Sequence, residues 1–274
     1  MKASTDFTAF TKLIRADVLK MIHAAKSGHP GGCLSCVEIL SVLYKEILNI
    51  PKNWSKAADF HSRDRFVLSK GHASATLYSV LANLGFCERE GLLGFRSLGS
   101  KFQGHPSSRH GLEGIEVSTG SLGQGLSIGV GMALGLRLDK SPAKVYVMLG
   151  DGEMQEGSVW ESLMGAVHQK LDNIVVIIDK NNLQIDGSVD SVKSLDPLDK
   201  KLAAFGWQTV VVDGHDTKAL SDALLTTKSA KVPYAIIANT VKGRGVSFME
   251  NNVSWHGKPL NSEELAVALE ELGG

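Results

Sequence analysis

The fold is decided by residues 144–187, which read KVYVMLGDGEMQEGSVWESLMGAVHQKLDNIVVIIDKNNLQIDG. Two apolar runs, Val145–Leu149 and Ile174–Ile178, have the length and composition of buried strands. Between them, apolar residues recur at helical spacing: Trp160, Leu163, Met164 and Val167. A strand–helix–strand unit of this size makes a right-handed crossover, so the two strands run parallel and end at the same edge of the sheet. We therefore expect a ligand site at that edge, where open parallel sheets bind their ligands.

A short polar turn follows each of these two strands. Asp151 lies between two glycines after the first strand, and Asn181 begins an Asn-Asn pair after the second. Because both strands end at one edge, we expect the two side chains to meet, although they are far apart in the sequence. Carboxylate and amide oxygens are ligands that Mg²⁺ prefers, together with water and phosphate oxygens. The alternative is an ordinary glycine turn and an ordinary asparagine turn in an α/β domain.

The backbone around Asp151 also suits a phosphate group. Glycine on both sides lets the chain come close to an anion. The helix expected to start near Gly157 would point its amide end, with its partial positive charge, toward the same place. This stretch therefore predicts a site for a phosphate group bound through magnesium.

The remainder of the chain repeats the alternation of strand and helix. Further apolar runs of strand length occur at residues 66–69, 208–212 and 234–239. Helical periodicity is found at residues 6–26, 35–48, 73–84, 198–205, 217–227 and 263–272. We predict an α/β fold, a doubly wound and mostly parallel sheet of about five strands with helices on both faces. Because the sequence has no internal repeat and no linker-like composition, residues 1–274 are interpreted as a single domain.

Three segments fall outside this alternation. Residues 50–65 are polar and irregular. Residues 94–119 have no clear period, and loops of this length in compact domains are usually functional. The segment that begins at Gly120 opens a helix with further glycines, at positions Gly129, Gly131 and Gly135. Because glycine is costly inside a helix, we expect another backbone to pack closely there.

The composition excludes several classes of partner. Hydrophobic residues make up 43% of the 274-residue chain and charged residues 21%, as in globular proteins with a substantial core. Lysine plus arginine and aspartate plus glutamate both number 29, which argues against nucleic acid or an acidic membrane surface as a partner. No apolar run reaches the length of a membrane span. The first ten residues lack a signal-peptide core, and with three cysteines we expect a cytoplasmic location.

Histidines supply a second group of candidate site residues. Four of the nine histidines lie beside glycine in irregular stretches: His29, His72, His105 and His256. A lone histidine is usually structural, but four in glycine-flanked loops indicate that some of them line a site. Their spacing does not match a zinc site. Polar residues also follow each expected strand, namely His72, Asp151, Asn181, His215 and Lys242.

Seven segments of the chain resemble transketolases, and they occur in that family's order. They are SGHPGG (27–32), SKGHA (69–73), FQGHP (102–106), STGSLGQG (118–125), GDGEMQEG (150–157), NNLQIDG (181–187) and SWHGKPL (254–260). GDG followed by NN at this spacing is similar to the thiamine diphosphate motif. The resemblance covers residues from about 10 to 260, and it implies the thiamine diphosphate-binding fold with thiamine diphosphate and Mg²⁺ as cofactors.

The resemblance also implies a role for each matching residue. The histidines that would surround the reacting carbon and the substrate hydroxyls are His29, His72, His105 and His256. The metal ligands would be Asp151, Asn181 and the carbonyl of Leu183. The cofactor-binding set would be His72, Gly120, Ser121, Leu122, Gly152, Glu156, Glu161, Asn181, Ile185 and Lys242. Within it, Glu156 and Glu161 match acids of the family's interface network between two active sites, although helix-dipole stabilisation would also explain them.

Transketolases that resemble this chain continue with a pyrimidine-binding domain and a C-terminal domain. We therefore expect residues 1–274 to be the diphosphate-binding half, the N-terminal subunit of a split transketolase. Two copies of each chain would form a heterotetramer that is active only when complete. The implied reaction, in the pentose phosphate pathway, moves a two-carbon ketol unit from a xylulose 5-phosphate type of ketose phosphate to a ribose 5-phosphate type of aldose phosphate.

Several alternatives stay open from the sequence. The chain could be half of another thiamine diphosphate enzyme, such as a deoxyxylulose phosphate synthase or a 2-oxo acid dehydrogenase. It could also be a transketolase for a sulfonated or branched sugar, or a non-catalytic cofactor-binding module. Cys33 and Cys36 form a C-x-x-C sequence that could be a redox pair, with buried packing residues as the alternative.

Overall fold

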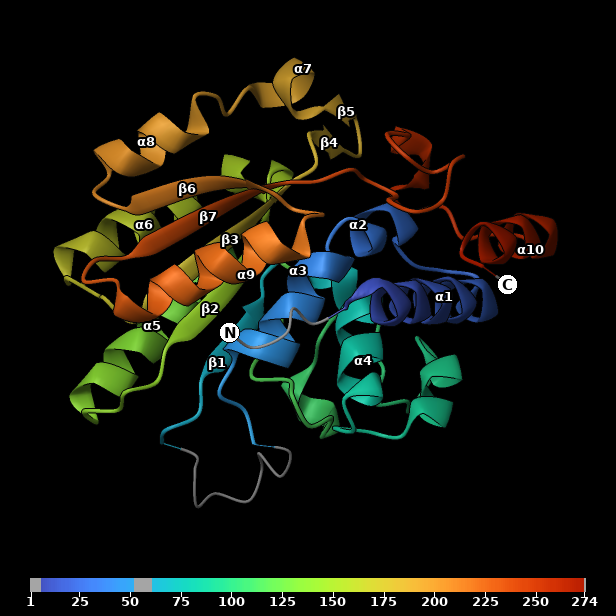
Figure 1. Cartoon of the computed structure of the whole chain (residues 1–274), viewed down its shortest axis with the longest axis horizontal. Coiled ribbons are helices and arrows are strands. Elements are labelled where there is room, and N and C mark those ends of the chain that lie inside the picture. Colours follow the sequence, from blue (N-terminus) through green and yellow to red (C-terminus); the bar gives the residue numbers. More distant parts are fainter. Residues whose placement is uncertain (1–5, 52–60, 274) are drawn as a thin grey trace.

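Five parallel strands form the central sheet of the computed structural model, which describes residues 6–51 and 61–273 (Figure 1). The strands are β1 Arg65–Leu68, β2 Val145–Gly150, β3 Ile174–Lys180, β6 Gln208–Asp213 and β7 Tyr234–Asn239. They lie in the order β1-β2-β3-β7-β6, and every neighbouring pair is parallel. The prediction of a parallel sheet of about five strands is confirmed, and all strands end at one edge.

The helices cover both faces of this sheet because side chains on each strand point alternately to one face and the other. Tyr146 and Met148 pack into one hydrophobic cluster, while Val145, Val147 and Leu149 pack into another. The first cluster contains residues of α1 Thr8–Ala25, α3 Val37–Val42, α4 Ser74–Asn83 and α9 Thr217–Thr226. The second contains residues of α5 Gln124–Leu138, α6 Gly157–His168 and α8 Leu198–Ala204. Figure 1 shows the sheet between these two helical layers.

The remaining strands and α-helices that the structure describes are a short hairpin and three further helices. A two-stranded antiparallel hairpin, β4 Leu183–Gln184 and β5 Gly187–Ser188, follows β3. The sequence did not predict it, since strands of two residues leave no periodic signal. The remaining α-helices of the described residues are α2 Pro30–Leu34, α7 Val189–Lys193 and α10 Ser262–Glu271. Within those residues, no helix combines the length and the apolarity that crossing a membrane requires.

The prediction of one continuous helix at residues 35–48 is wrong, because the helical structure starts earlier and is divided into shorter segments. Helical structure begins with α2 at Pro30, inside the SGHPGG motif, continues as α3 and ends in a π-helical turn at Leu43–Ile47. Pro30 is the first residue of α2, a position that proline favours because its fixed φ suits the helix start. Most of the irregular segment expected at residues 50–65 lies outside the described residues.

The expectation of a closely packed backbone at the glycines of α5 is confirmed at Gly125, where an added Cβ would lie 2.8 Å from the Cα of Ser69, but it is wrong for the later glycines. The helix begins at Gln124, within the segment 120–125 that was expected to open it. A Cβ at Gly129 would lie 2.4 Å from the Cγ2 of Val147, so this glycine accommodates a side chain of β2 rather than a second backbone. A Cβ at Gly131 or at Gly135 would meet nothing within 4 Å. Part of the α5 surface therefore faces away from the rest of the described chain.

Candidate functional site

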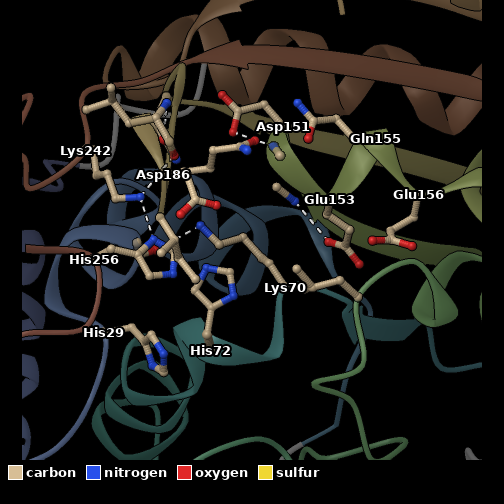
Figure 2. Close-up of a pocket in the computed structure, with 18 of the residues that line it drawn as sticks. His29, Lys70, His72, Asp151, Glu153, Gln155, Glu156, Asp186, Lys242 and His256 are labelled. Carbon is tan, nitrogen blue, oxygen red and sulfur yellow. Dashed lines mark hydrogen bonds between the residues drawn. The ribbon is translucent and has the colours of Figure 1, made fainter. Parts of the chain in front are cut away.

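A cavity of about 360 Å³ lies at the carboxyl edge of the sheet (Figure 2). Four strands each place a side chain there: His72 follows β1, Asp151 follows β2, Asn181 follows β3 and Lys242 follows β7. The fifth strand, β6, does not contribute, because His215 after it turns toward Glu38 instead. The parallel topology thus gathers residues from distant parts of the chain into one cavity.

Asp151 and Asn181 meet at this edge, as the sequence predicts. The Asp151 amide donates to the Asp179 carbonyl at 3.2 Å, and the Asp151 carboxylate accepts hydrogen bonds from the amides of Gly152 (2.8 Å) and Asn182. Asn181 Oδ1 accepts from the Leu183 amide at 3.2 Å. Burial, and then the nearby charge of Asp179, raise the pKa of Asp151 to about 6. A carboxylate that is only 2% exposed is thus costly to ionise unless a cation joins it.

The oxygens around Asp151 fit a hard divalent cation. Asp151, Asn181 and Leu183, which carry carboxylate, amide and carbonyl oxygens, all line the cavity. Gln184 Oε1 is buried there without a hydrogen-bond partner among the described residues, close to the position that a Cβ on Gly152 would occupy. Buried polar atoms are normally satisfied, so this oxygen also points to a missing donor or ion. In the part of the chain that the structure describes, no cluster of three or more His, Cys, Asp or Glu forms a metal site.

Lys242 projects into the same cavity and is 2% exposed. Its ammonium group donates to the Leu183 carbonyl at 3.0 Å and contacts His256 Nδ1 at 2.8 Å. Burial, and then repulsion by Lys70, lower the pKa of Lys242 to about 8. The Leu183 carbonyl accepts this hydrogen bond from Lys242 with one lone pair, so its second lone pair is left for another partner.

The four histidines singled out in the sequence form one cluster in the cavity. Ring centroids of His29 lie 5.5 Å from those of His72 and His256, and 6.0 Å from that of His105. Burial, followed by nearby cationic groups, lowers the pKa of all four, to about 4 for His29 and about 3 for His256. They are therefore neutral near pH 7, and each can both donate and accept a hydrogen bond.

Two glycines make room for these imidazoles. A Cβ at Gly32 would lie 3.0 Å from His72 Nε2, and a Cβ at Gly120 would lie 2.9 Å from the ring of His105. The side chains of other residues would displace the rings, so each of these two glycines has a steric function.

Three buried charges at the site were missed by the sequence analysis: Lys70, Asp179 and Glu153. Lys70 forms an ion pair with Asp179 and donates to the Gly32 carbonyl at 2.9 Å. Asp179 also accepts from the hydroxyls of Ser35 (2.6 Å) and Thr240. Burial opposes the charge of Asp179, but Lys70 and the two hydroxyls together outweigh it and keep the pKa of this carboxyl below its usual value. The sequence offered one signal for this buried pair, because the charged residue Asp179 directly follows the apolar run of β3.

Glu153 connects three segments beneath the cavity. Its carboxylate accepts from the amides of Gly123 (3.0 Å) and Gly150 (3.1 Å) and from the hydroxyl of Ser69. It therefore joins the ends of β1 and β2 to the turn that precedes α5. The glutamate of the GDGE sequence has a structural function that spacing alone did not suggest.

Most of the cofactor-binding set predicted from the resemblance lines the cavity, but two members do not. The lining includes Gly120, Leu122, Gly152, Glu156 and Ile185. Ser121 and Glu161 are exposed and lie outside this lining. Cys33 and Cys36 are fully buried, and burial raises the pKa of both thiols, to about 12 for Cys36. Thiols in this state are poor nucleophiles, which favours the packing interpretation over a redox pair.

Comparison with known proteins places this geometry in a family. A family model described as the transketolase thiamine diphosphate binding domain matches residues 7–274. The chain belongs to the transketolase family. It carries the thiamine diphosphate-binding domain of that family, and the fold expected from the resemblance is confirmed.

Transketolases of two kinds are similar to this chain. One subunit of an apulose-4-phosphate transketolase from Phocaeicola vulgatus is 40% identical over 94% of this chain and 90% of its own length. The human transketolase is 41% identical over 94% of this chain but only 41% of its own length. Because the first of these proteins is named as one of the subunits of its enzyme, its name implies a partner subunit.

Solved transketolase structures show the same fold. The transketolase from Campylobacter jejuni has a TM-score of 0.87 and 36% identity, covering 97% of this chain and 42% of its own. A transketolase variant from Pichia stipitis has a TM-score of 0.90 and 33% identity, covering 98% of this chain and 41% of its own. The chain thus spans about two fifths of the length of these long transketolases.

Proposed function

We propose that this chain is the cofactor-binding subunit of a two-chain transketolase, which transfers a two-carbon ketol unit from a ketose phosphate to an aldose phosphate. The observation that supports it is the meeting of four strand ends in one cavity with Asp151, Asn181, Lys242 and a cluster of neutral imidazoles. When bound, thiamine diphosphate would supply the group that stabilises a carbanion. The chain itself has to hold the diphosphate and move protons on the sugar hydroxyls.

Asp151, Asn181 and the Leu183 carbonyl are proposed to hold Mg²⁺, and Lys242 to neutralise part of the diphosphate charge. Oxygen ligands and a lysine ammonium are the groups that magnesium-bound phosphates use in proteins. The raised pKa of Asp151 and the unpartnered Gln184 oxygen support the metal assignment. Gly120, Leu122, Gly152, Glu156 and Ile185 line the same cavity and remain the proposed cofactor contacts, as does His72.

His29, His72, His105 and His256 are proposed to bind the sugar hydroxyls and to transfer their protons. A general base has to be unprotonated at the operating pH before it can accept a proton. Burial keeps these rings neutral, so each nitrogen that lacks hydrogen can accept a hydroxyl proton. In Figure 2, His29 and His72 lie at the side of the cavity away from Asp151, whereas His256 lies beside Lys242, which also binds the Leu183 carbonyl.

Cofactor binding can be tested on the chain alone. We expect Asp151→Asn to abolish the Mg²⁺-dependent part of thiamine diphosphate binding, as measured by isothermal titration calorimetry with and without Mg²⁺. Asp199→Asn, on the exposed side of α8, is the matched control and should bind like the wild type. Unchanged, Mg²⁺-dependent affinity in Asp151→Asn would remove Asp151 from the metal site.

A second chain is part of the proposal because the relatives of matching length are each named as one subunit of their enzyme. The exposed side of α5 and α6 is the surface that we propose for such a partner. Met164 is 53% exposed there, and the open positions at Gly131 and Gly135 lie on α5, which packs against α6. The partner would carry the pyrimidine-binding and C-terminal domains, and two copies of each chain would complete two sites.

The two-chain hypothesis predicts inactivity of the isolated chain. We expect the neighbouring reading frame to encode the partner, a chain of similar size that carries the pyrimidine-binding domain. Purified separately and then mixed with thiamine diphosphate and Mg²⁺, the two chains should transfer ketol units, while neither should do so alone. Substantial turnover by the isolated chain would contradict the hypothesis, and binding of cofactor without turnover in any mixture would favour a non-catalytic module.

The sugar pair is a separate part of the proposal. Xylulose 5-phosphate and ribose 5-phosphate types are the first candidates, from the resemblance to transketolases. Apulose 4-phosphate is the second candidate donor, because two relatives that this chain matches over nearly their full length carry that name. Comparing kcat/KM for these donors in the reconstituted enzyme would decide between them.

A further inference from the structure

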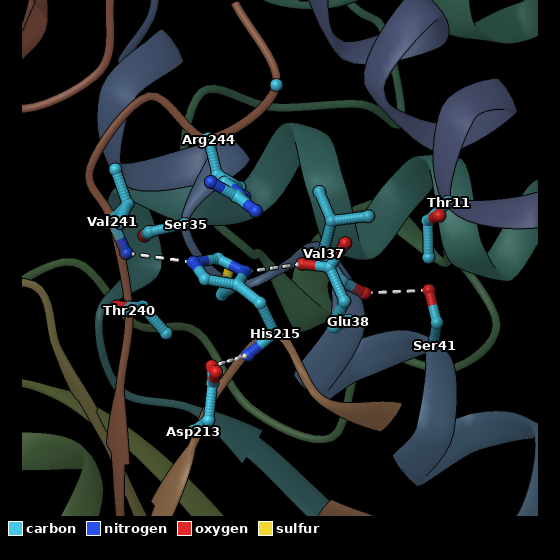
Figure 3. A network of polar contacts seen from close by, with 12 residues as sticks. Thr11, Ser35, Val37, Glu38, Ser41, Asp213, His215, Thr240, Val241 and Arg244 are labelled. Carbon is cyan, nitrogen blue, oxygen red and sulfur yellow. Dashed lines mark hydrogen bonds and ion pairs between the residues drawn. The ribbon is translucent and has the colours of Figure 1, made fainter. Parts of the chain in front are cut away.

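Three side chains outside the cavity form a polar network around one of its loops (Figure 3). They are Arg15 of α1, Glu38 of α3 and His215, which follows β6. We call them the Glu38 network. The loop is Val241–Gly245, which leaves the sheet after β7 and carries Lys242. None of the three side chains lines the cavity.

The hydrogen bonds of the network have an unambiguous direction. The Val241 amide donates to His215 Nε2 at 2.8 Å, and His215 Nδ1 lies 2.9 Å from a carboxylate oxygen of Glu38. A backbone amide can only donate, so Nε2 has to accept and Nδ1 has to carry the proton that is donated to Glu38. His215 is therefore held as one tautomer of the neutral imidazole, and Figure 3 shows its ring between Val241 and Glu38.

Arg15 completes the network from the other side. Its two terminal nitrogens bind Glu38 at 2.7 and 2.9 Å, and its Nε donates to the Arg244 carbonyl at 2.8 Å. A Cβ at Gly245, which has φ +92°, would lie 2.9 Å from Arg15, so the guanidinium packs directly on the loop backbone. Burial opposes the charge of Glu38, but the bonds from His215 and Arg15 keep the pKa of this carboxyl below its usual value.

The two bonds to the loop lie on either side of Lys242. Val241 is held by its amide just before the lysine, and Arg244 by its carbonyl two residues after it. The Gly243 amide also donates to the Gly31 carbonyl at 3.0 Å. With its backbone held on both sides, Lys242 extends its ammonium group to the Leu183 carbonyl and His256 in the cavity.

We propose that Arg15, Glu38 and His215 are positioning residues, which hold the Val241–Gly245 loop so that Lys242 reaches the diphosphate end of the cavity. The effect on cofactor affinity rests on the proposed function, whereas the effect on the loop does not. A buried ion pair such as Arg15–Glu38 adds little net stability, because desolvation offsets the attraction. Its contribution here is geometric, since it orients the two groups that bind the loop.

Two substitutions of His215 separate its two hydrogen bonds. The amide nitrogen of His215→Asn can replace Nδ1 as donor to Glu38 but provides no acceptor for the Val241 amide. The amide oxygen of His215→Gln can reach the place of Nε2 and accept from Val241, without a donor for Glu38. We expect hydrogen exchange of the amides in Val241–Gly245 to speed up at least tenfold in the asparagine variant and less than threefold in the glutamine variant.

The same variants test the consequence for ligand binding. We expect His215→Asn to weaken thiamine diphosphate binding in the presence of Mg²⁺ about tenfold, and His215→Gln to weaken it less than threefold. Inorganic pyrophosphate should show the same ranking, since the loop acts on the diphosphate. His168→Asn, at the exposed end of α6, is the matched control and should change neither exchange in the loop nor affinity.

A double-mutant cycle with Lys242→Met shows whether His215 acts through the lysine. If it does, His215→Asn should weaken binding much less in the Lys242→Met background than in the wild type. An equal loss in both backgrounds, or unchanged loop exchange in His215→Asn, would overturn the proposal. If the wild type binds neither ligand while exchange still responds as expected, the proposed function fails and the positioning of the loop stands.

Arg15→Lys provides an independent variant in case His215→Asn does not fold. Lysine keeps a cation beside Glu38 but lacks the Nε donor to the Arg244 carbonyl. Faster exchange of the Gly243 and Gly245 amides, with unchanged exchange in the strands of the sheet, is expected. Protection equal to that of the wild type would overturn the proposal.

Discussion

Burial sets the charge of the residues in the cavity. The imidazoles of His29, His72, His105 and His256 lose water on folding, and the cationic groups around them also disfavour a further positive charge. Asp151 is affected in the opposite direction, because burial favours its neutral acid. A cavity that holds neutral bases beside an under-compensated carboxylate is suited to bind a cation and to form hydrogen bonds with hydroxyl groups.

These shifts predict how stability depends on pH. The pKa of His29 is about 4 in the folded chain and 6.5 in the reference state, so between these values only the unfolded chain binds the proton. Stability is therefore lost as pH falls from about 6.5 toward 4. The raised pKa of Asp151 has the opposite effect below about pH 6, where protonation of this carboxyl stabilises the folded chain. Asp151 is one group, whereas several histidines have lowered pKa values, so the net stability should still fall.

Thermal unfolding of the cofactor-free chain should thus occur at progressively lower temperature between pH 7 and pH 4.5. His29→Asn cannot bind the proton and should show a shallower decline over the same range. Equal slopes in the wild type and the variant would contradict the assignment of a neutral, buried imidazole.

The Lys70–Asp179 pair predicts a large loss of stability when one partner is removed. Both side chains are at most 1% exposed, so Lys70→Met leaves a buried carboxylate without its cation. We expect a loss of about 3–5 kcal/mol in the free energy of unfolding, measured with urea. Lys180→Met removes the partly exposed pair with Asp196 and should cost less than about 1 kcal/mol. Similar losses in the two variants would show that burial of the pair is not decisive.

Helix α5 shows how one residue type can have different functions within a single element. Gly129 faces β2, where an added Cβ would come within 2.4 Å of Val147, while the surroundings of Gly131 are open. Gly129→Ala should therefore destabilise the chain by about 1–3 kcal/mol through overpacking. Gly131→Ala should stabilise it by about 0.5–1 kcal/mol through helix propensity. Chemical unfolding of both variants tests this, and a loss of stability in Gly131→Ala would show that this glycine is also packed.

The loops that follow the strands depend on contacts between elements. Asp151 after β2 binds the amide of Asn182 after β3, and Lys242 after β7 binds the Leu183 carbonyl. Each loop is thus held by the next one along the edge of the sheet. A substitution in one loop should accordingly change the geometry of its neighbour before it changes the strands.

The α5–α6 surface gives a prediction for the whole molecule. Met164 is 53% exposed on this surface, so Met164→Lys should leave the thermal stability of the isolated chain nearly unchanged. If the surface binds the second chain, the same substitution should strongly weaken assembly, because it buries an unpaired charge. Sedimentation of the mixed chains measures this, with Lys170→Met, exposed just beyond α6, as control. Normal assembly of Met164→Lys would place the partner elsewhere.

The sequence by itself determined the order and type of the main elements and the edge at which the site lies. The apolar runs that became β1, β2, β3 and β7 are visible because burial on both faces requires continuous apolar residues. The edge strand β6 is more exposed and was recognised by its run of β-branched valines. Asp151, Asn181, Lys242 and the four cavity histidines could be predicted because parallel strands end at a common edge and because their motifs resemble those of a known family.

Only the tertiary structure decided which polar groups compensate one another. Lys70 and Asp179 are 109 positions apart, the Val241 amide binds His215, and Ser121 and Glu161 lie outside the lining of the cavity. Hydrophobic periodicity is a property of neighbours along the chain, so a sequence displays it directly. Compensation of buried charge depends on distances of about 3 Å between segments that meet only after folding, and no local pattern records those distances.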